Sequence, residues 1–493
     1  MSRNSKTESY RLLYSVMDIP VDIGYVAYAI MFYEGVGNLF PWNAFITASN
    51  YYSQRFCGTS FEGNFENFFS ITYTLSQTIG LIFSVIYQNK ISLSNKIIWP
   101  LLCYSTIFGI TTLLVAIKDI DPTLLFWITL LSACCCGLCG ALLSGGLFGL
   151  GAMFPPVYTA ALMNGQGLAG LIVAVSGMLT SLASAPIDDC NDGADDSSCD
   201  QKIDYSALAY FIIATIILLS CILAYMALGQ LHFTKFYISR AKGDEKETDV
   251  VSPLITEDED RRFSDDNDDV SLGGRMSVIQ HAHTSAGRAS SAEVLVSLLE
   301  GDRPDESAAL SFDKIWAVYR QIVIPSLSVF FDFTVTIGIF PSLIVLLESE
   351  HKCTSSNRFS NDLYVPFFFL MFNLFDFIGR VTGGATTPLF TDKNVWMAAA
   401  ARTVFVPLFL LCRVSNSQLP VVFKSDAFPI VFMAMMAFSN GYTASLCMMM
   451  GASAVSVQDA PIAGTIMILS LTVGLFMGAA VSFLVVIISQ GSL

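Results

Sequence analysis

Long apolar runs alternate with polar segments along almost the whole chain. A run of about 20 apolar residues is long enough to cross the hydrocarbon core of a bilayer as an α-helix. The hydropathy is interrupted at Pro100, at Pro155 and Pro156, and at several glycines, which blurs some edges. The pattern predicts an all-α polytopic membrane protein with eleven spanning helices, at residues 24–49, 69–88, 97–117, 124–153, 157–185, 206–231, 321–347, 363–385, 394–413, 428–450 and 461–489.

The longest polar segment divides these predicted helices into six and then five. It is acidic, rich in Ser, Asp and Gly and poor in aromatic residues, a composition typical of disorder. Within it, the sequence RRFS ending at Ser264 is a candidate site for a basophilic kinase, and the alternative is a solvated tether with a chance match. We therefore expect an N-terminal arm (1–23), a six-helix bundle (24–231), a disordered linker (232–320) and a five-helix bundle (321–493).

The loops predict which way the chain sits in the membrane. Most Lys and Arg residues outside the predicted spans lie in the arm, the linker and two short loops, which the positive-inside rule assigns to the cytosol. The four cysteines outside the spans, Cys57, Cys190, Cys199 and Cys353, all fall in loops on the opposite side, where oxidising conditions favour disulfides. We expect a cytosolic N-terminus and linker and a disulfide between Cys190 and Cys199, with Cys57 and Cys353 as a second candidate pair.

Composition agrees with the hydropathy. The chain is 53% hydrophobic and only 14% charged, whereas soluble proteins have about 25% charged residues. The net charge of −15 comes from the segments 188–204 and 244–306, so it indicates neither a basic partner nor a nucleic acid. We expect a multi-pass protein of the plasma membrane. An endolysosomal or vacuolar membrane is the alternative, because Glu8, Leu12 and Leu13 fit an acidic di-leucine sorting pattern.

The eighth predicted span carries charges inside an apolar run. Helical periodicity places Phe369, Asn373, Asp376 and Arg380 on one stripe, with the acid and the guanidinium at i,i+4 spacing, where they can neutralise each other. Ionisable groups within a membrane are by default candidates for a functional site. The alternative is an ion pair that only locks the bundle. An aromatic, an amide and two charges on one face favour a site for a small, neutral, hydroxyl-rich solute.

Two other passages contain candidate site residues. In the first span, Pro41 is expected to kink the helix, and Leu39, Trp42, Asn43 and Ile46 share one face. An indole offers a surface on which a nucleobase can stack, although anchoring at the membrane interface is the ordinary role of a membrane tryptophan. The second passage, residues 140–170, is rich in glycine, which by itself indicates close helix packing.

Together these passages resemble a known family. The sequences PWN, GGLFGLGAMFPPVYTAALMNGQGLAG, FTVTIGIFP, FNLFDFIGR and SNGYTASLCMMMG are similar, in order and spacing, to those of the equilibrative nucleoside transporters. The resemblance covers nearly every predicted span. It implies eleven helices in a major-facilitator-like six-plus-five arrangement with a cytosolic N-terminus. It also implies transport of nucleosides, sometimes nucleobases, by alternating access.

The resemblance assigns roles to individual residues. Asp376 and Arg380 match the family's charged pair on the ribose side of the substrate. The other matching positions, which line or pack the substrate site, are Leu39, Trp42, Asn43, Ile46, Thr78, Leu81, Gly140, Phe369, Asn373 and Leu475.

The sequence also departs from the family pattern. Ser144 stands where well-studied members usually have a glutamine that hydrogen-bonds the base, so we expect looser base recognition here. Glu34 and Asp332 are unexpected acids within spans. Each is a candidate proton site, and the alternative for Glu34 is structural pairing with another helix. Helical periodicity places Glu34 on a different face of the helix from Trp42, which argues against direct contact with the substrate.

The leading hypothesis is a carrier that moves nucleosides by facilitated diffusion. The alternatives are a proton-coupled nucleoside or nucleobase carrier and, in a different class, a membrane nutrient receptor that does not transport. An enzyme is not expected, because all four histidines lie in loops or at a span edge and no nucleophile–base motif occurs. We expect no cofactor and no metal. The expected partners are the nucleoside, the lipid bilayer and a kinase acting on the linker.

Overall fold

The computed structural model describes residues 20–61, 65–117, 120–183, 205–242, 310–354, 357–385 and 389–491. The regular structure in these ranges is helical apart from two isolated β-bridges, Leu347 with Val414 and Cys412 with Phe423. The predicted disulfide between Cys190 and Cys199, the candidate phosphorylation site at Ser264 and the sorting pattern at residues 8–13 lie outside the described residues.

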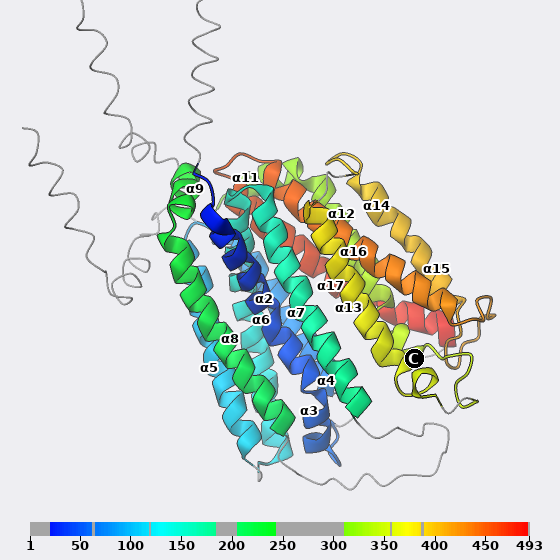
Figure 1. The fold of residues 1–493 in the computed structure, drawn as a ribbon. Helices are drawn as coiled ribbons and strands as arrows, with labels where there is room; N and C mark the ends of the chain where they lie inside the picture. Colours follow the sequence, from blue (N-terminus) through cyan, green and yellow to red (C-terminus); the bar gives the residue numbers. More distant parts are fainter. Residues whose placement is uncertain are drawn as a thin grey trace, which may run out of the picture.

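The first bundle, on the left of Figure 1, is formed by the N-terminal half of the chain. Within it α2 packs on α7 and α8, α4 packs on α6, and α5 packs on α6 and α8. Its elements are η1 (Ile23–Tyr25), α2 (Val26–Thr47), α3 (Ser49–Phe56), α4 (Phe65–Ile86), α5 (Leu93–Ala116), α6 (Pro122–Met153), α7 (Pro156–Ala183) and α8 (Tyr205–Gln230).

The second bundle, on the right of Figure 1, is formed by the C-terminal half. Here α12 packs on α16 and α17, and α13 packs on α16. The predicted span at 394–413 consists of three short consecutive pieces, α14, η6 and α15. The elements of this half are α12 (Val323–Ile339), η4 (Ile344–Leu346), η5 (Arg358–Ser360), α13 (Tyr364–Ala385), α14 (Val395–Ala401), η6 (Arg402–Val404), α15 (Phe405–Leu410), α16 (Ala427–Ser453) and α17 (Ala460–Gln490).

The described part of the chain contains 9 helices that are long and apolar enough to cross a membrane, and a shorter apolar run at Val395–Leu410. In addition, α2 occupies the position of the first predicted span. Pro41 lies inside that helix, which continues on both sides of it. The helical, multi-pass architecture is confirmed, whereas the count of eleven spans stays a prediction.

The expected linker is too long at both ends. Residues His232–Lys242 form helix α9 and residues Phe312–Gln321 form helix α11. Apolar side chains within these polar segments explain the difference, because they find partners on the bundles: Phe233 of α9 stacks against Tyr158, with ring centroids 5.0 Å apart. The disordered linker predicted for residues 232–320 is therefore corrected at both ends, where the chain is helical.

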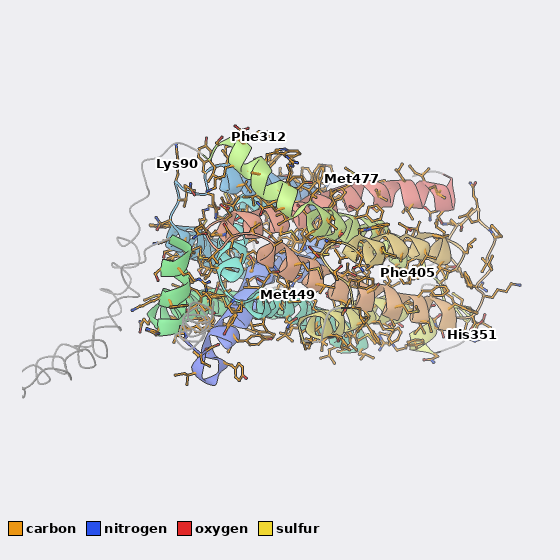
Figure 2. All side chains as sticks on the ribbon, turned by 90° about the horizontal axis from the view of Figure 1, so that it is seen from above. Lys90, Phe312, His351, Phe405, Met449 and Met477 are labelled. Atoms are coloured by element: carbon orange, nitrogen blue, oxygen red, sulfur yellow. The ribbon has the colours of Figure 1, made fainter. Side chains whose placement is uncertain are left out.

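The segments that the sequence assigns to one side of the membrane lie at one end of the molecule. The start of α2, α9 and α11 lie together at one end of the bundles, and α3 lies at the other (Figure 1). Seen from above, Lys90 and Phe312 lie towards one end and His351 lies at the opposite end (Figure 2). Cys57 and Cys353, both in loops assigned to the outside, each take part in a disulfide. Both cysteines thus lie in loops that the sequence assigns to the same side of the membrane, and the orientation itself stays a prediction.

The two bundles meet along pairs of helices that approach closely at glycines. A Cβ atom added to Gly464 of α17 would lie 2.3 Å from the backbone oxygen of Phe148 in α6, and one added to Gly167 of α7 would lie 2.8 Å from Cδ of Arg380 in α13. A Cβ at Gly464 would overlap the backbone of α6, and one at Gly167 would require the Arg380 side chain to move. The glycine-rich passage around residues 140–170 is therefore where the halves of the protein touch, and it brings the charged stripe of α13 against the first bundle.

Candidate functional site

The centre of the candidate site is the carboxylate of Asp376 on α13. Arg380, one turn further along the helix, donates from Nε to Asp376 Oδ2 at 2.7 Å. The two residues are only 6% and 7% exposed. The predicted i,i+4 neutralisation is thus confirmed, and it explains how a helix within the bilayer can hold both charges.

A residue on the neighbouring helix holds the other oxygen of this carboxylate. Asn440 of α16 donates from Nδ2 to Asp376 Oδ1 at 2.7 Å. The close approach depends on Gly441, since a Cβ at that position would lie 1.9 Å from the backbone oxygen of Asp376. A glycine beside the asparagine therefore lets α16 come near enough to α13 for the amide to reach the acid.

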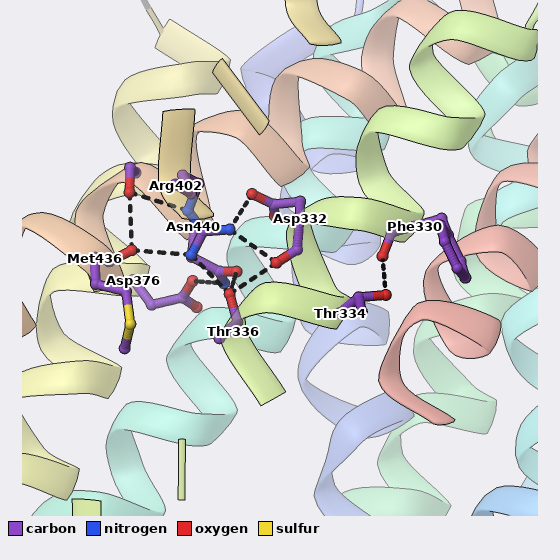
Figure 3. A network of polar contacts seen from close by, with 9 residues as sticks. Phe330, Asp332, Thr334, Thr336, Asp376, Arg402, Met436 and Asn440 are labelled. Atoms are coloured by element: carbon purple, nitrogen blue, oxygen red, sulfur yellow. Dashed lines mark hydrogen bonds and ion pairs between the residues drawn. The ribbon is translucent and has the colours of Figure 1, made fainter. Parts of the chain in front are cut away.

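From Asn440 a buried polar network continues through the second bundle (Figure 3). Thr336 Oγ1 of α12 lies 2.7 Å from Asn440 Oδ1. Arg402 of η6 donates from Nη2 to Thr336 Oγ1 at 2.6 Å, and it forms an ion pair with Asp332, which is completely buried. Two ion pairs, Asp376–Arg380 and Asp332–Arg402, are thus linked by one amide and one hydroxyl. We call these six residues the α13–α16 network.

Arg380 ties this network to Met163 of the first bundle. Arg380 Nη1 donates to the backbone oxygen of Met163 in α7 at 3.3 Å. Nearby, Asn373 Oδ1 lies so close to α7 that a Cβ on Gly170 would approach it to 2.5 Å. Phe369, one turn before Asn373, packs against Phe340 with ring centroids 4.8 Å apart. The predicted stripe therefore lies at the contact between the two bundles.

A second group of predicted residues comes together on α2, α4 and α6. The ring of Trp42 lies 4.6 Å from that of Tyr73 on α4, tilted by 30°. Gly140 of α6 faces two phenols, since a Cβ there would lie 2.6 Å from the hydroxyl of Tyr104 and 3.1 Å from that of Tyr73. Trp42 thus packs within the first bundle against an aromatic partner rather than standing alone as an interfacial anchor.

Ser144 has a hydrogen-bond partner that the sequence did not suggest. Its hydroxyl donates to Oδ1 of Asn38 on α2 at 2.9 Å, and both residues are buried. The hydroxyl proton of Ser144 is therefore already used in this hydrogen bond. The amide of Asn38 thus lies beside Ser144.

The remaining predicted residues are less informative. Leu81 is completely buried in the core of the first bundle. Thr78 is half-buried, and its hydroxyl donates to the backbone oxygen of Thr74 at 2.8 Å. Leu39 and Leu475 are half-buried and pack against the core. Asn43 is 8% exposed, and the side chain of Ile46 lies outside the described residues.

The two unexpected acids behave differently. Asp332 is paired with Arg402, which favours a structural role over a proton relay. Glu34 of α2 is 1% exposed, and neither carboxyl oxygen has a hydrogen-bond partner among the residues that the structure describes. The structural pairing considered for Glu34 is therefore not found in that part of the chain.

An apolar cavity of about 730 Å³ lies elsewhere, between α13, α14 and α16. Arg402 is the one residue that it shares with the α13–α16 network, and none of the residues predicted from the sequence lines it. The candidate site is thus defined by the polar groups on α13 and α16 and by the aromatic and amide groups on α2, α4 and α6.

Comparison with known sequences gives one family. The model of the nucleoside transporter family matches residues 130–487. Equilibrative nucleoside transporter 1 of Rattus norvegicus is 32% identical over 496 residues, which are 94% of this chain and 98% of that protein. Equilibrative nucleoside transporter 2 of Homo sapiens is 31% identical over 497 residues, covering 95% of this chain and 98% of that protein.

Comparison with solved structures gives the fold. The major facilitator superfamily proton:xylose symporter XylE superposes with a TM-score of 0.56 at 11% identity, covering 92% of this chain and 87% of that one. The major facilitator FucP, in an outward conformation, gives a TM-score of 0.52 at 13% identity, covering 93% and 97%. The predicted major-facilitator-like fold is confirmed.

Proposed function

Because this chain belongs to the nucleoside transporter family, we propose that it carries nucleosides across a membrane by facilitated diffusion. The observation that carries this proposal is the carboxylate of Asp376, buried at the contact of the two bundles and held on one oxygen by Arg380 and on the other by Asn440. The rest of the site is proposed from the positions of the side chains around it.

Asp376 is suited to bind the ribose of the substrate. Each carboxylate oxygen has about two lone pairs, so after accepting from Arg380 and Asn440 the group can still accept from two hydroxyls. Vicinal diols present two such donors side by side. Arg380 and Asn440 fix the orientation of the carboxylate, and charge-assisted hydrogen bonds are stronger than neutral ones.

The group on α2, α4 and α6 is suited to bind the base. Trp42, supported by Tyr73, provides an aromatic face, and stacking of a base on such a face is typically worth about 1–3 kcal/mol. Asn38 and Ser144 provide an amide and a hydroxyl beside it. A short serine in place of glutamine leaves fewer direct contacts to the base edge, so we expect purine and pyrimidine nucleosides to compete within a few-fold of each other.

Transport requires the bundles to separate alternately at the two ends. At the inner end Gly464 of α17 touches α6. At the outer end Arg358 of η5 donates to the backbone oxygens of Ser181 and Leu182, at 2.7 and 3.0 Å, at the end of α7. The bonds of Arg358 are accepted by backbone oxygens. The ion pairs Asp376–Arg380 and Asp332–Arg402 each lie within the second bundle, so either end can open without breaking one of these pairs.

The proposal also covers location and regulation. We propose that the carrier resides in the plasma membrane, with an endolysosomal or vacuolar membrane as the alternative. A kinase acting at Ser264 is a separate proposal, based only on the RRFS sequence. A carrier needs no catalytic group, so an enzymatic role is not proposed.

Uptake by proteoliposomes tests the function directly. Radiolabelled uridine and adenosine should enter until the internal and external concentrations are equal, and entry of uridine should be competed by adenosine. The analogue 2′,3′-dideoxyuridine, which lacks the ribose diol, should compete much less well. Binding of uridine without entry would instead support the nutrient receptor. Equal competition by the dideoxy analogue would overturn the role of Asp376 in ribose binding.

A further inference from the structure

The acid Glu34 on α2 has no role in the site described above, and its surroundings are unusual. It is 1% exposed, and both of its carboxyl oxygens lack a hydrogen-bond partner in the described part of the chain. The other two acids that are buried in the described part of the chain, Asp332 and Asp376, are each paired with an arginine. A carboxylate without water, cation or hydrogen-bond donor is costly, and such a group takes up a proton instead.

The helices around Glu34 offer no positive charge. Helix α2 packs mainly on α6, α7 and α8, and the sequences of these three helices contain no Lys, Arg, His, Asp or Glu. The titratable side chains that interact with Glu34 are Tyr33 on its own helix and Cys221 on α8. Neither can become a cation.

The charged groups at the two ends of α2 are engaged elsewhere. At the beginning, the carboxylate of Asp22 accepts from the backbone nitrogens of Ala27 and Tyr28. On α3, beyond the other end, Arg55 donates to the backbone oxygen of Ile117. Glu34 is thus separated from both by several helical turns.

Close packing keeps water away from Glu34 in this conformation. A Cβ atom on the adjacent Gly35 would lie 2.3 Å from the backbone oxygen of Leu162 in α7, and one on Gly37 would lie 2.4 Å from Sγ of Cys221 in α8. One turn further along α2, Asn38 bonds Ser144 of the candidate base site. The acid is therefore enclosed by the same helix contacts that position this site.

We propose that Glu34 is a proton-binding site that makes nucleoside transport depend on protons. The side chain is a neutral acid whenever α2 is packed as seen here, and it releases its proton only when α2 moves away from α7 and α8 and water reaches the carboxyl group. If every transport cycle passes through the packed conformation, the rate falls as the proton concentration falls, even with the same pH on both sides of the membrane.

Infrared difference spectroscopy of the purified full-length protein at neutral pH tests the protonation itself. Subtracting the spectrum of Glu34→Gln from that of the wild type should leave a carbonyl stretching band of a protonated carboxylic acid. The Glu66→Gln variant is the matched control, because Glu66 is an exposed acid at the start of α4. It should leave no such band. If Glu34→Gln does not fold, Glu34→Asp should shift the band. A spectrum without the band overturns the proposal.

Uptake of uridine into proteoliposomes with equal pH on both sides tests the consequence for transport. Because one proton is involved, the wild-type rate should fall by at most about tenfold per pH unit as the pH is raised from about 6 to about 9. Glu34→Gln, which mimics the protonated acid, should lose this dependence, and Glu66→Gln should keep it. A flat wild-type profile, or an unchanged profile in Glu34→Gln, overturns the proposal. The uptake experiment rests on the proposed nucleoside transport, whereas the infrared experiment needs no substrate. Failure of the proton site can therefore be distinguished from failure of the proposed function.

Discussion

Replacement of Asp376 by asparagine tests whether this acid binds substrate or only clamps the bundle. The carboxylate accepts from Arg380 on one oxygen and from Asn440 on the other, both at 2.7 Å. An asparagine has one acceptor oxygen and one NH₂ group, so it can satisfy only one of these donors. If Asn440 rotates its amide to accommodate the change, the mismatch passes to Thr336, which bonds Asn440 Oδ1.

The structure gives a magnitude for this change. Removing one partner of a buried ion pair typically costs about 3–5 kcal/mol. Arg380 keeps its bonds to Met163, to the backbone oxygen at 3.3 Å and to Sδ at 3.9 Å, so we expect about 3 kcal/mol, at the lower end of that range. That loss corresponds to roughly a hundredfold in an equilibrium constant. Asp376→Glu, which retains the charge, should keep part of the activity.

The assay is the initial rate of uridine uptake, corrected for the amount of protein in the membrane, together with the melting temperature of the purified variants. Asp376→Asn should lose nearly all uptake and melt at a lower temperature than the wild type. In the double variant Asp376→Asn with Arg380→Gln, the unpaired cation is removed and the melting temperature should recover. Uptake should stay low if the acid binds ribose.

Two results would contradict this reasoning in different ways. Recovery of uptake in the double variant would show that the pair is a structural clamp. Wild-type uptake in Asp376→Asn alone would refute both roles, because neither a buried unpaired arginine nor a missing ribose acceptor is compatible with normal transport.

Three further predictions concern other parts of the molecule. Gly167→Ala should slow uptake severalfold, because a Cβ there meets the charged stripe of α13. Gly177→Ala on the same helix should transport normally, because a Cβ at that position has no atom within 4 Å. Equal uptake rates of the two variants would refute the close contact. Ser144→Ala removes a buried hydrogen bond, worth about 0.5–1.5 kcal/mol, and should change the ratio of adenosine to uridine uptake by up to about tenfold. Ser144→Gln should sharpen the preference between the two nucleosides. Unchanged uptake ratios in both variants would place this residue away from the base. Deleting residues 244–306 should leave uptake in membrane-inserted protein largely intact, because this segment lacks the apolar content for a core, and complete loss would show that it does more than connect the bundles.

Hydropathy predicted most of the fold because the bilayer sets the length of each apolar helix. The predicted span 124–153, for example, is α6, Pro122–Met153. The method failed where polar and apolar residues alternate, as in α11, in which Asp313, Lys314 and Arg320 share one short helix with Trp316. Such a helix packs on the bundle through one apolar face only, and the mean hydropathy of the whole segment conceals that face.

The candidate site was predictable along one helix but not between helices. The i,i+4 spacing of Asp376 and Arg380 predicts that both side chains lie on one face of the helix, because the period of the α-helix is fixed. The partner Asn440 comes from a helix whose rotation relative to α13 depends on close packing at glycines, which the sequence does not give. Arg402 did leave a signal, since it is a charge in the middle of the predicted span 394–413 and needs a counter-charge. Asp332 was the unexplained acid that could provide it.

The pairing of charges in the α13–α16 network has an electrical consequence. Moving one elementary charge across the membrane potential involves about 2.3 kcal/mol per 100 mV. Asp376 with Arg380 and Asp332 with Arg402 each sum to zero, a nucleoside is neutral, and a protonated Glu34 is neutral as well. The rocking of one bundle against the other therefore displaces almost no net charge, and turnover should be insensitive to voltage. A variant that neutralises one member of a pair leaves a charge that moves with the bundle, and its turnover should respond to the membrane potential.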